Sequence, residues 1–168
     1  MLKLNLAGVG RGEVRLGGSI PVDDPLWSAA GLTPAEPLTV ELAARSVGAG
    51  VFVRGAMRTR LMLACRRCLK AVSVPLDEKM DLLFQDLMEE NGDGAGEVYP
   101  IPPKALEIDL TDAVREQLLL RLPRFVLCME ECSGLCPRCG ADLNQAPCAC
   151  APVETLSSWS ALKQVKFD

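Results

Sequence analysis

The sequence predicts an α+β protein: an antiparallel sheet with a long β-hairpin, one principal α-helix and a C-terminal Cys-rich zinc-knuckle segment. Several segments alternate apolar and polar residues with period two, as half-buried strands do. One segment repeats apolar residues at every fourth position, as an amphipathic helix does. Six of the eight cysteines fall between residues 128 and 150. Together these observations predict a core of sheet and helix with a small metal-binding extension.

The length and composition fit one compact domain with such an extension. Of the 168 residues, we assign 1–127 to the core domain and 128–168 to a Cys-rich zinc-binding segment that ends in a short helix. Hydrophobic residues make up 49% of the chain, which is enough for a core. The net charge of −4 argues against a protein that coats nucleic acid through its overall charge.

The chain contains no His. This excludes Ser-His-Asp and Cys-His catalysis, as well as metal sites with mixed Cys and His ligands. We see no signal peptide, and no apolar run approaches the roughly 18 residues that span a bilayer. We therefore expect a cytoplasmic protein. In that reducing compartment, closely spaced cysteines are more often metal ligands or redox thiols than structural disulfides.

The N-terminal part of the chain predicts three strands with a break between the second and the third. Residues 2–6 and 14–16 alternate apolar and polar side chains. Prolines punctuate residues 21–37, which predicts an interruption of regular structure. The alternation resumes over residues 38–42 and predicts the third strand.

The clearest pattern extends from Val51 to Phe84 and predicts a long hairpin. On the first arm, apolar residues occupy odd-numbered positions and arginines occupy even-numbered ones, which assigns them to opposite faces of one strand. On the second arm, apolar residues occupy even-numbered positions: Val72, Val74, Leu76, Met80, Leu82 and Phe84. The turn between the arms, residues 65–70, contains the first pair of cysteines.

A loop and the principal helix follow the hairpin. Residues 86–98 predict a mobile acidic loop, because they contain five acidic residues, no basic one and several glycines. Residues 106–122 predict a helix in which Thr111 is the N-cap and which Pro123 ends. Its apolar residues recur at every fourth position: Leu110, Val114, Leu118 and Leu122.

The eight cysteines fall into four close pairs: Cys65–Cys68, Cys128–Cys132, Cys136–Cys139 and Cys148–Cys150. A Zn²⁺ ion takes four ligands in a tetrahedron, and a two-residue spacer lets both sulfurs of a pair reach the same ion. Four pairs therefore predict two zinc ions, each held by four cysteines without any His.

The spacing also indicates which pairs share an ion. We expect site 1 to consist of Cys65, Cys68, Cys128 and Cys132, and site 2 to consist of Cys136, Cys139, Cys148 and Cys150. In site 2 the first pair resembles a zinc knuckle, because Pro137 stiffens its turn and Gly140 follows it. Eight residues then separate the two pairs, enough for a short loop back to the same ion. Crossed combinations, in which the hairpin cysteines share an ion with the knuckle pair, stay open.

Other roles for the thiols are buried core cysteines and a redox-active pair. Four spaced pairs argue against core cysteines. A redox Cys-x2-Cys motif normally lies at the strand-to-helix turn of a βαβ unit, and no such pattern surrounds Cys65 or Cys136. Four thiolates in a chain without an electron-transfer domain favour zinc over iron.

Residues 51–76 contain six basic residues and no acidic ones, although the chain as a whole is acidic. The six are Arg54, Arg58, Arg60, Arg66, Arg67 and Lys70. This stretch predicts a surface that contacts RNA phosphates or a partner protein, since Arg binds phosphate in a bidentate manner. A solvated outer face of the sheet explains the same residues equally well.

The order of these motifs resembles the YceD family over essentially the whole chain. The matching features are Cys-Arg-Arg-Cys-Leu in the hairpin turn, the segment 107–110 with its helix, Cys-x3-Cys-x-Gly-Leu-Cys-Pro-x-Cys-Gly-x-x-Leu-Asn, Cys-x-Cys and a final Trp-x-Ala-Leu-Lys. The resemblance implies a role in the accumulation or maturation of large-subunit (23S) ribosomal RNA, without catalytic activity. Some family members keep counterparts of only the four site 1 cysteines, with His matching Cys128, which implies that the two sites are separable.

We therefore expect a non-enzymatic factor for 23S ribosomal RNA, stabilised by two structural four-cysteine zinc sites. Its partner is expected to be large-subunit ribosomal RNA or a ribosome-assembly protein, with no membrane and no small-molecule substrate. Two alternatives belong to other classes. One is a thiol redox regulator that uses the Cys-x2-Cys pairs, and the other is a zinc-ribbon adaptor that binds only proteins.

Overall fold

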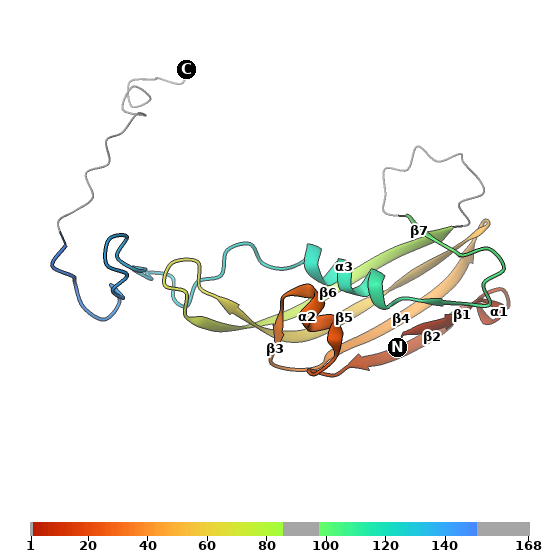
Figure 1. Ribbon diagram of the computed structural model, residues 1–168. Helices are drawn as coiled ribbons and strands as arrows, with labels where there is room; N and C mark the ends of the chain where they lie inside the picture. Colours follow the sequence, from red (N-terminus) through yellow and green to blue (C-terminus); the bar gives the residue numbers. More distant parts are fainter. Residues whose placement is uncertain (1, 86–97, 151–168) are drawn as a thin grey trace, which may run out of the picture.

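The structure is a computed structural model that describes residues 2–85 and 98–150 (Figure 1). Its main sheet has six strands, and it is accompanied by a two-stranded sheet and by few helices. The main sheet follows the order β2-β4-β5-β6-β7, and β3 pairs with β5 beside this path. Its strands are β2 (Val14–Ile20), β3 (Thr33–Pro34), β4 (Leu38–Val47), β5 (Gly50–Ala64), β6 (Ala71–Gln85) and β7 (Val98–Pro100).

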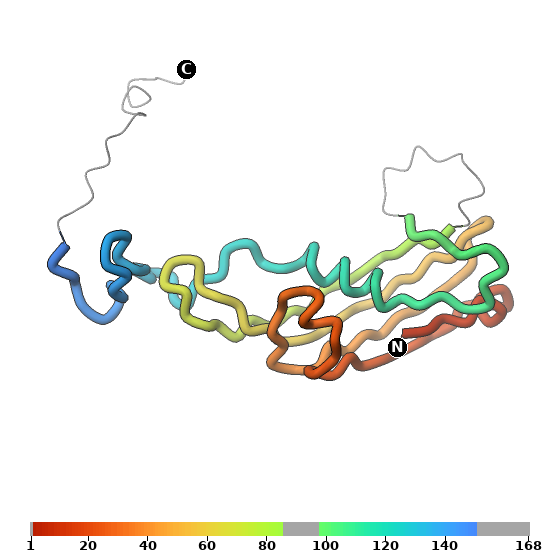
Figure 2. Tube along the Cα trace, in the orientation of Figure 1, coloured from red at the N-terminus to blue at the C-terminus, as the bar shows by residue number. Residues whose placement is uncertain are grey.

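Strands β5 and β6 form the long hairpin that the alternating pattern predicts. They pair in antiparallel register from Val51 opposite Phe84 to Ala64 opposite Ala71. The odd-numbered apolar residues of β5 face the core, and Val53 and Met57 are fully buried. Figure 2 shows that the end of this hairpin projects beyond the rest of the sheet, toward the Cys-rich segment.

The close approach of β4 and β5 requires a glycine. Gly55 lies opposite Leu42 in the register. A Cβ atom at position 55 would fall well inside van der Waals contact with the Glu41 carbonyl oxygen and would also meet Leu42 Cα at 2.8 Å. Because both neighbours are backbone atoms, they could move apart only if the strands separated.

Helix α3 (Thr111–Leu120) packs on the sheet and completes the core. Leu110, Val114 and Leu118 are fully buried, as the four-residue repeat predicts. The start of α3 is fixed by the small sheet, in which β8 (Glu107–Asp109) pairs with β1 (Lys3–Asn5). The backbone of Leu110 then donates a hydrogen bond to Leu2 O, at 2.8 Å.

The principal helix begins later in the chain than the sequence predicts, because the residues before it pair with β1. Residues 107–109 are a strand, so α3 begins at Thr111, and Leu110 occupies the N-cap position. The Asp109 carboxylate accepts a hydrogen bond from the Thr111 amide at 2.9 Å. Asp109, and not the predicted Thr111, thus provides the side-chain acceptor at the start of α3. Propensity alone could not show that a distant N-terminal strand competes for these residues.

Three more expectations were wrong in part. Residues 21–37 are not without regular structure, because they contain α2 (Pro25–Ala30), with Asp24 as N-cap, and strand β3. The buried side chain of Trp27 holds α2 in place by donating to Pro21 O at 2.7 Å. The sheet is also not purely antiparallel, since β7 runs parallel to β6. The first helix, α1 (Leu6–Val9), begins within the first predicted strand.

Some expectations lie outside the described residues. These are the short C-terminal helix and almost all of the acidic loop, of which only Val98 is described, as part of β7. The division of the chain at residue 127 stays a prediction. Within residues 2–85 and 98–150, none of the helices is long and apolar enough to cross a membrane.

Candidate metal centres

The hairpin turn between β5 and β6 positions the first two sulfurs. The turn is closed by hydrogen bonds from Cys65 N to Lys70 O (2.8 Å) and from Leu69 N to Cys65 O (2.9 Å). Leu69 adopts a left-handed conformation with φ of 60°, which lets the chain reverse within this short turn. Cys65 and Cys68 are both buried and face inward.

The segment after α3 supplies the other two sulfurs of site 1. It is held against the turn by backbone hydrogen bonds from Arg66 N to Val126 O (2.8 Å) and from Leu135 N to Arg67 O (3.1 Å). These bonds bracket Cys128 and Cys132, and so hold the second pair next to the first. Site 1 therefore joins two segments that are far apart in the sequence.

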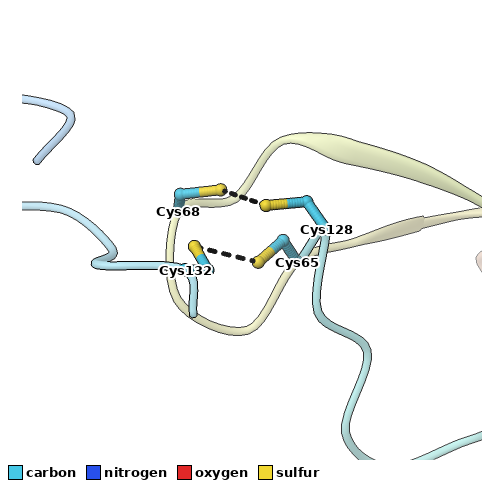
Figure 3. A group of neighbouring side chains, drawn as sticks. All are labelled: Cys65, Cys68, Cys128 and Cys132. Atoms are coloured by element: carbon cyan, nitrogen blue, oxygen red, sulfur yellow. Dashed lines mark hydrogen bonds between the residues drawn. The ribbon is translucent and has the colours of Figure 1, made fainter. Parts of the chain in front are cut away.

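The four sulfurs of site 1 lie at distances that suit a tetrahedral metal ion (Figure 3). The Sγ atoms of Cys65 and Cys132 are 3.8 Å apart, and those of Cys68 and Cys128 are 3.5 Å apart. A tetrahedron with Zn–S bonds near 2.3 Å has edges of about 3.8 Å, whereas a disulfide would bring two sulfurs to about 2.05 Å. All eight cysteines of the chain are free.

Site 2 begins at Cys136, which lies four residues after Cys132 and starts the knuckle. Its turn is closed by Gly140 N donating to Cys136 O (2.9 Å) and by Cys136 N donating to Ala141 O (2.8 Å). Gly140 has a φ of 73°, as the knuckle motif predicts. Cys136, Cys139, Cys148 and Cys150 form this second group, and in each group all sulfurs lie within 4.8 Å of one another. The crossed combinations are thus not the ones that the structure brings together.

Site 2 is the more open of the two groups. Three of the four cysteines of site 1 are buried, and Cys128 is half-buried. In site 2 only Cys136 is buried, whereas Cys139 is exposed and the last pair is half-buried. An ion in site 2 would therefore exchange with solvent and chelators more readily than an ion in site 1.

Backbone amides favour ionisation of one sulfur in each group. The Cys68 amide is the main cause that lowers the pKa of the Cys65 thiol to about 6, and the Cys139 amide does the same for Cys136. In contrast, a hydrogen bond with the Cys68 thiol and burial raise the pKa of Cys128 to about 12. Crowded sulfurs cannot all ionise beside one another without a cation, and a dication would supply the compensating charge.

A polar loop supports the sulfurs from outside, and the sequence patterns did not single it out. Asn144 donates from Nδ2 to Cys132 Sγ (3.5 Å) and accepts from the Ser133 amide (2.7 Å). Asp142 accepts from the Asn144 backbone amide at 3.0 Å and so fixes that loop. Two signals in the sequence mark this loop: the Asp-Leu-Asn triplet, which is typical of an Asx turn, and the Leu-Asn that ends the long cysteine motif.

The basic residues of the sheet face are paired with acidic ones. Arg54 contacts Asp81 at 2.9 Å and Arg58 contacts Asp77 at 3.1 Å. Arg60 similarly contacts Glu36 at 3.1 Å. The window of residues 51–76 contains none of these partners, because Asp77 and Asp81 follow it on β6 and Glu36 precedes it. The sheet face is therefore less positive than the window alone indicates. Each pair is exposed, and exposed ion pairs contribute little to stability.

The basic residues of the hairpin turn have different surroundings. Lys70 forms an ion pair with Asp142 at 2.7 Å. Arg67 donates to Cys132 O at 2.8 Å, and Arg66 donates to Arg124 O at 3.0 Å. Among the described residues, no carboxylate forms an ion pair with Arg66 or Arg67. The turn is therefore the part of the basic stretch that keeps uncompensated positive charge.

Several known proteins resemble the chain. A chloroplastic protein of Zea mays, named "Large ribosomal RNA subunit accumulation protein YCED homolog 1", is 27% identical over 163 residues, which cover 80% of this chain and 55% of the relative. The protein of the same name from Arabidopsis thaliana is 25% identical over 138 residues, 67% of this chain and 43% of the relative. An uncharacterised protein of Mycobacterium tuberculosis is 30% identical over 112 residues, 66% of this chain and 53% of the relative.

The chain spans about half the length of these curated relatives. No solved structure matches it significantly. The profile of the family described as "Large ribosomal RNA subunit accumulation protein YceD" matches residues 53–166, and so extends from the hairpin through both groups of cysteines. This match covers more than half of the chain, and on that basis the chain belongs to the YceD family.

Proposed function

We propose that the chain acts, without catalysis, in the accumulation or maturation of large-subunit (23S) ribosomal RNA, and that two structural zinc ions stabilise it. The RNA is suggested by the family description and by the names of the maize and Arabidopsis relatives. The metal is supported by the observation that carries the proposal, the two groups of four converging sulfurs.

The donor set fits zinc in a structural role. Four thiolates with no other ligand suit Zn²⁺, and a closed set of four leaves no open position for a substrate. Site 1 would hold its ion between the hairpin and the segment after α3, and site 2 would hold its ion within the C-terminal loop. When bound, zinc would contribute free energy of folding directly, because the unfolded chain offers no assembled site.

We place the protein in the cytoplasm, because both groups require reduced thiols. We take its partner to be large-subunit ribosomal RNA or a ribosome-assembly protein. A thiol redox regulator is less well supported, since the sulfurs stand in two groups of four and not as a single reactive pair. Elemental analysis of protein purified without added metal separates these ideas. About two zinc ions per chain supports the proposal, and no metal with rapidly reacting thiols contradicts it.

The biological role is tested by deleting the gene and measuring 23S against 16S ribosomal RNA. We expect the 23S level to fall selectively and to be restored by the wild-type gene. Cys68→Ser should restore it poorly, whereas Ser133→Ala is a suitable control, because Ser133 uses only its backbone amide toward Asn144. A balanced ratio with normal ribosomal subunits in the deletion strain would contradict the ribosomal role.

A further inference from the structure

The segment between α3 and site 1 displays an aromatic ring in solvent. Phe125 is 80% exposed, which makes it the most exposed large hydrophobic side chain among the described residues. The Arg66 guanidinium carbon lies 5.7 Å from the centre of its ring. Arg66 also donates from Nε to Arg124 O at 3.0 Å, so the hairpin turn orients its arginine over the ring. This cluster, which we call the Phe125 platform, comprises Arg66, Arg124 and Phe125.

The positive charge of the Phe125 platform is available to an external anion. Within residues 2–85 and 98–150, no carboxylate forms an ion pair with Arg66 or Arg124. The sheet arginines differ in this respect, since Arg54 contacts Asp81 at 2.9 Å. Arg66 uses its Nε–H toward Arg124 O, so it is the terminal Nη groups that it offers for a bidentate contact with phosphate.

The other ring flanked by arginine does not offer the same surface. Phe52 is only partly exposed, and guanidinium groups of Arg45 and Arg54 lie 5.5 and 5.3 Å from the centre of its ring. Among the described residues, Phe125 has a single such neighbour, and its exposure is far greater. The Phe125 ring can therefore accept a second flat group, which the Phe52 ring cannot.

A shallow apolar hollow adjoins the Phe125 platform. It has a volume of about 440 Å³ and is lined by Arg66, Arg124, Val126 and leucines that include Leu120. Leu120 is 60% exposed although it is large and apolar. Exposed apolar surface rimmed by charge is typical of an interaction site, and here the rim is positive.

We propose that the Phe125 platform binds an unpaired nucleotide of RNA, with the base stacked on the Phe125 ring and the flanking phosphates held by Arg66 and Arg124. This inference rests on the proposed role in ribosomal RNA and gives it a contact point. An aromatic ring offers a stacking surface to any base, while neighbouring arginines contact the backbone. The contact is expected to be tolerant of sequence, and specific for single strands, because bases inside a duplex are stacked on both faces.

The test is a binding titration of the full, zinc-loaded chain with a short fluorescent single-stranded oligoribonucleotide of mixed sequence. Phe125→Leu keeps an apolar side chain but removes the ring, and we expect it to weaken binding between about 5- and 150-fold. Phe125→Tyr should bind as the wild type does. Arg124→Ala should weaken binding and lower the slope of log affinity against log salt by about 0.7. Arg54→Ala is the matched control and should leave affinity unchanged.

Because Phe125 is exposed, we expect its substitution to leave the fold intact, so that a change in affinity reports on the ring itself. Each variant is first checked for wild-type zinc content and melting temperature. Equal affinity of the wild type and Phe125→Leu for RNA would overturn the inference and leave the ribosomal role intact. Absence of RNA binding by the wild type, together with selective loss of 23S RNA in the deletion strain, would also overturn it and would point to a protein partner. A balanced 23S to 16S ratio with binding that depends on Phe125 would support the nucleotide site and contradict the ribosomal role.

Discussion

Lys70 in the hairpin turn and Asp142 in the C-terminal loop form an ion pair, with Nζ and Oδ2 2.7 Å apart. The carboxylate is largely shielded from solvent, since the Asp142 side chain is 14% exposed. Hydrogen bonding to Lys70 is the main cause that holds the pKa of Asp142 well below its usual range. Because Asp142 also fixes Asn144, this ion pair connects the turn of site 1 with the loop of site 2.

We expect the ion pair to slow the loss of metal from the C-terminal loop. Lys70→Met keeps most of the aliphatic stem but removes the charge, so the variant should release zinc to a chelator faster than the wild type. Lys79→Met is the control, because the exposed Lys79 side chain lies on the sheet, away from both groups of cysteines. Equal release rates for Lys70→Met and the wild type would contradict the coupling.

Asn144 is expected to strengthen site 1 from outside, through its N–H contact with Cys132 Sγ. Removing such a supporting partner typically costs 10- to 100-fold in metal affinity. We therefore expect Asn144→Ala to bind zinc about 10- to 100-fold more weakly, as measured by competition with a chromophoric chelator. Ser133→Ala keeps the backbone amide that Asn144 accepts from, and should retain wild-type affinity.

The two groups of cysteines should lose their ions separately. Cys136→Ser should remove one zinc ion and loosen only the C-terminal loop. Cys68→Ser should remove the other ion and release the hairpin turn from residues 126–135. Amide hydrogen exchange would locate each effect, because the Arg66 amide bonds Val126 O and is protected only while the turn is docked. Both variants keeping the wild-type metal content and melting temperature would refute the two-site arrangement.

Zinc binding is expected to weaken as the pH falls. At pH 7 the Cys65 thiol, with a pKa of about 6, is largely ionised, whereas Cys128, with a pKa of about 12, is protonated, and the pKa of Cys68 is also raised. An ion entering site 1 therefore displaces at least the protons of Cys68 and Cys128. Two displaced protons correspond to about a 100-fold loss of affinity per unit fall in pH. Chelator competition between pH 6 and pH 8 measures this slope, and a flat profile would argue against thiolate ligands.

Gly55→Ala should destabilise the sheet. The added methyl group would overlap backbone atoms of β4, and overpacking of this kind typically costs about 1–3 kcal/mol. Gly17→Ala is the matched control, because its Cβ would meet Val40 O at an ordinary 3.6 Å. Denaturant unfolding compares the stability of the two zinc-loaded variants. Equal unfolding midpoints would show that β4 and β5 can move apart without a cost in free energy.

The elements that sequence patterns predict well are those with a strong local period. The hairpin from Val51 to Phe84 has one parity on each arm, and a strand with one buried face must keep that parity. The grouping of the cysteines followed from short spacers and from the turn chemistry around Pro137 and Gly140. In these cases the information lies within a few residues of the feature itself.

The features that the sequence patterns did not predict depend on partners that are distant in the sequence. Residues 107–109 form a strand because they pair with Lys3–Asn5, and β7 is parallel because of where the chain returns beside β6. The pairing of the sheet arginines likewise depends on distant residues, since Asp81 contacts Arg54 only through the register of the hairpin. Helix α2 was the exception, because Asp24 followed by Pro25 is a local helix-start signal that the prolines around it obscured.

The position of site 1 at the end of the longest strands has a topological consequence. Cys68 and Cys128 are separated by 60 positions in the chain, so an ion held by both closes a large ring of polypeptide. An ion that binds only the folded chain adds its binding free energy to folding, and it does not restrict the unfolded chain as a disulfide of that span would. The ring differs from a disulfide in what opens it, because a chelator cuts it and a reductant does not. A cell that keeps its thiols reduced could therefore still link the hairpin turn to the segment after α3 through the ion. It could release the two segments by withholding metal.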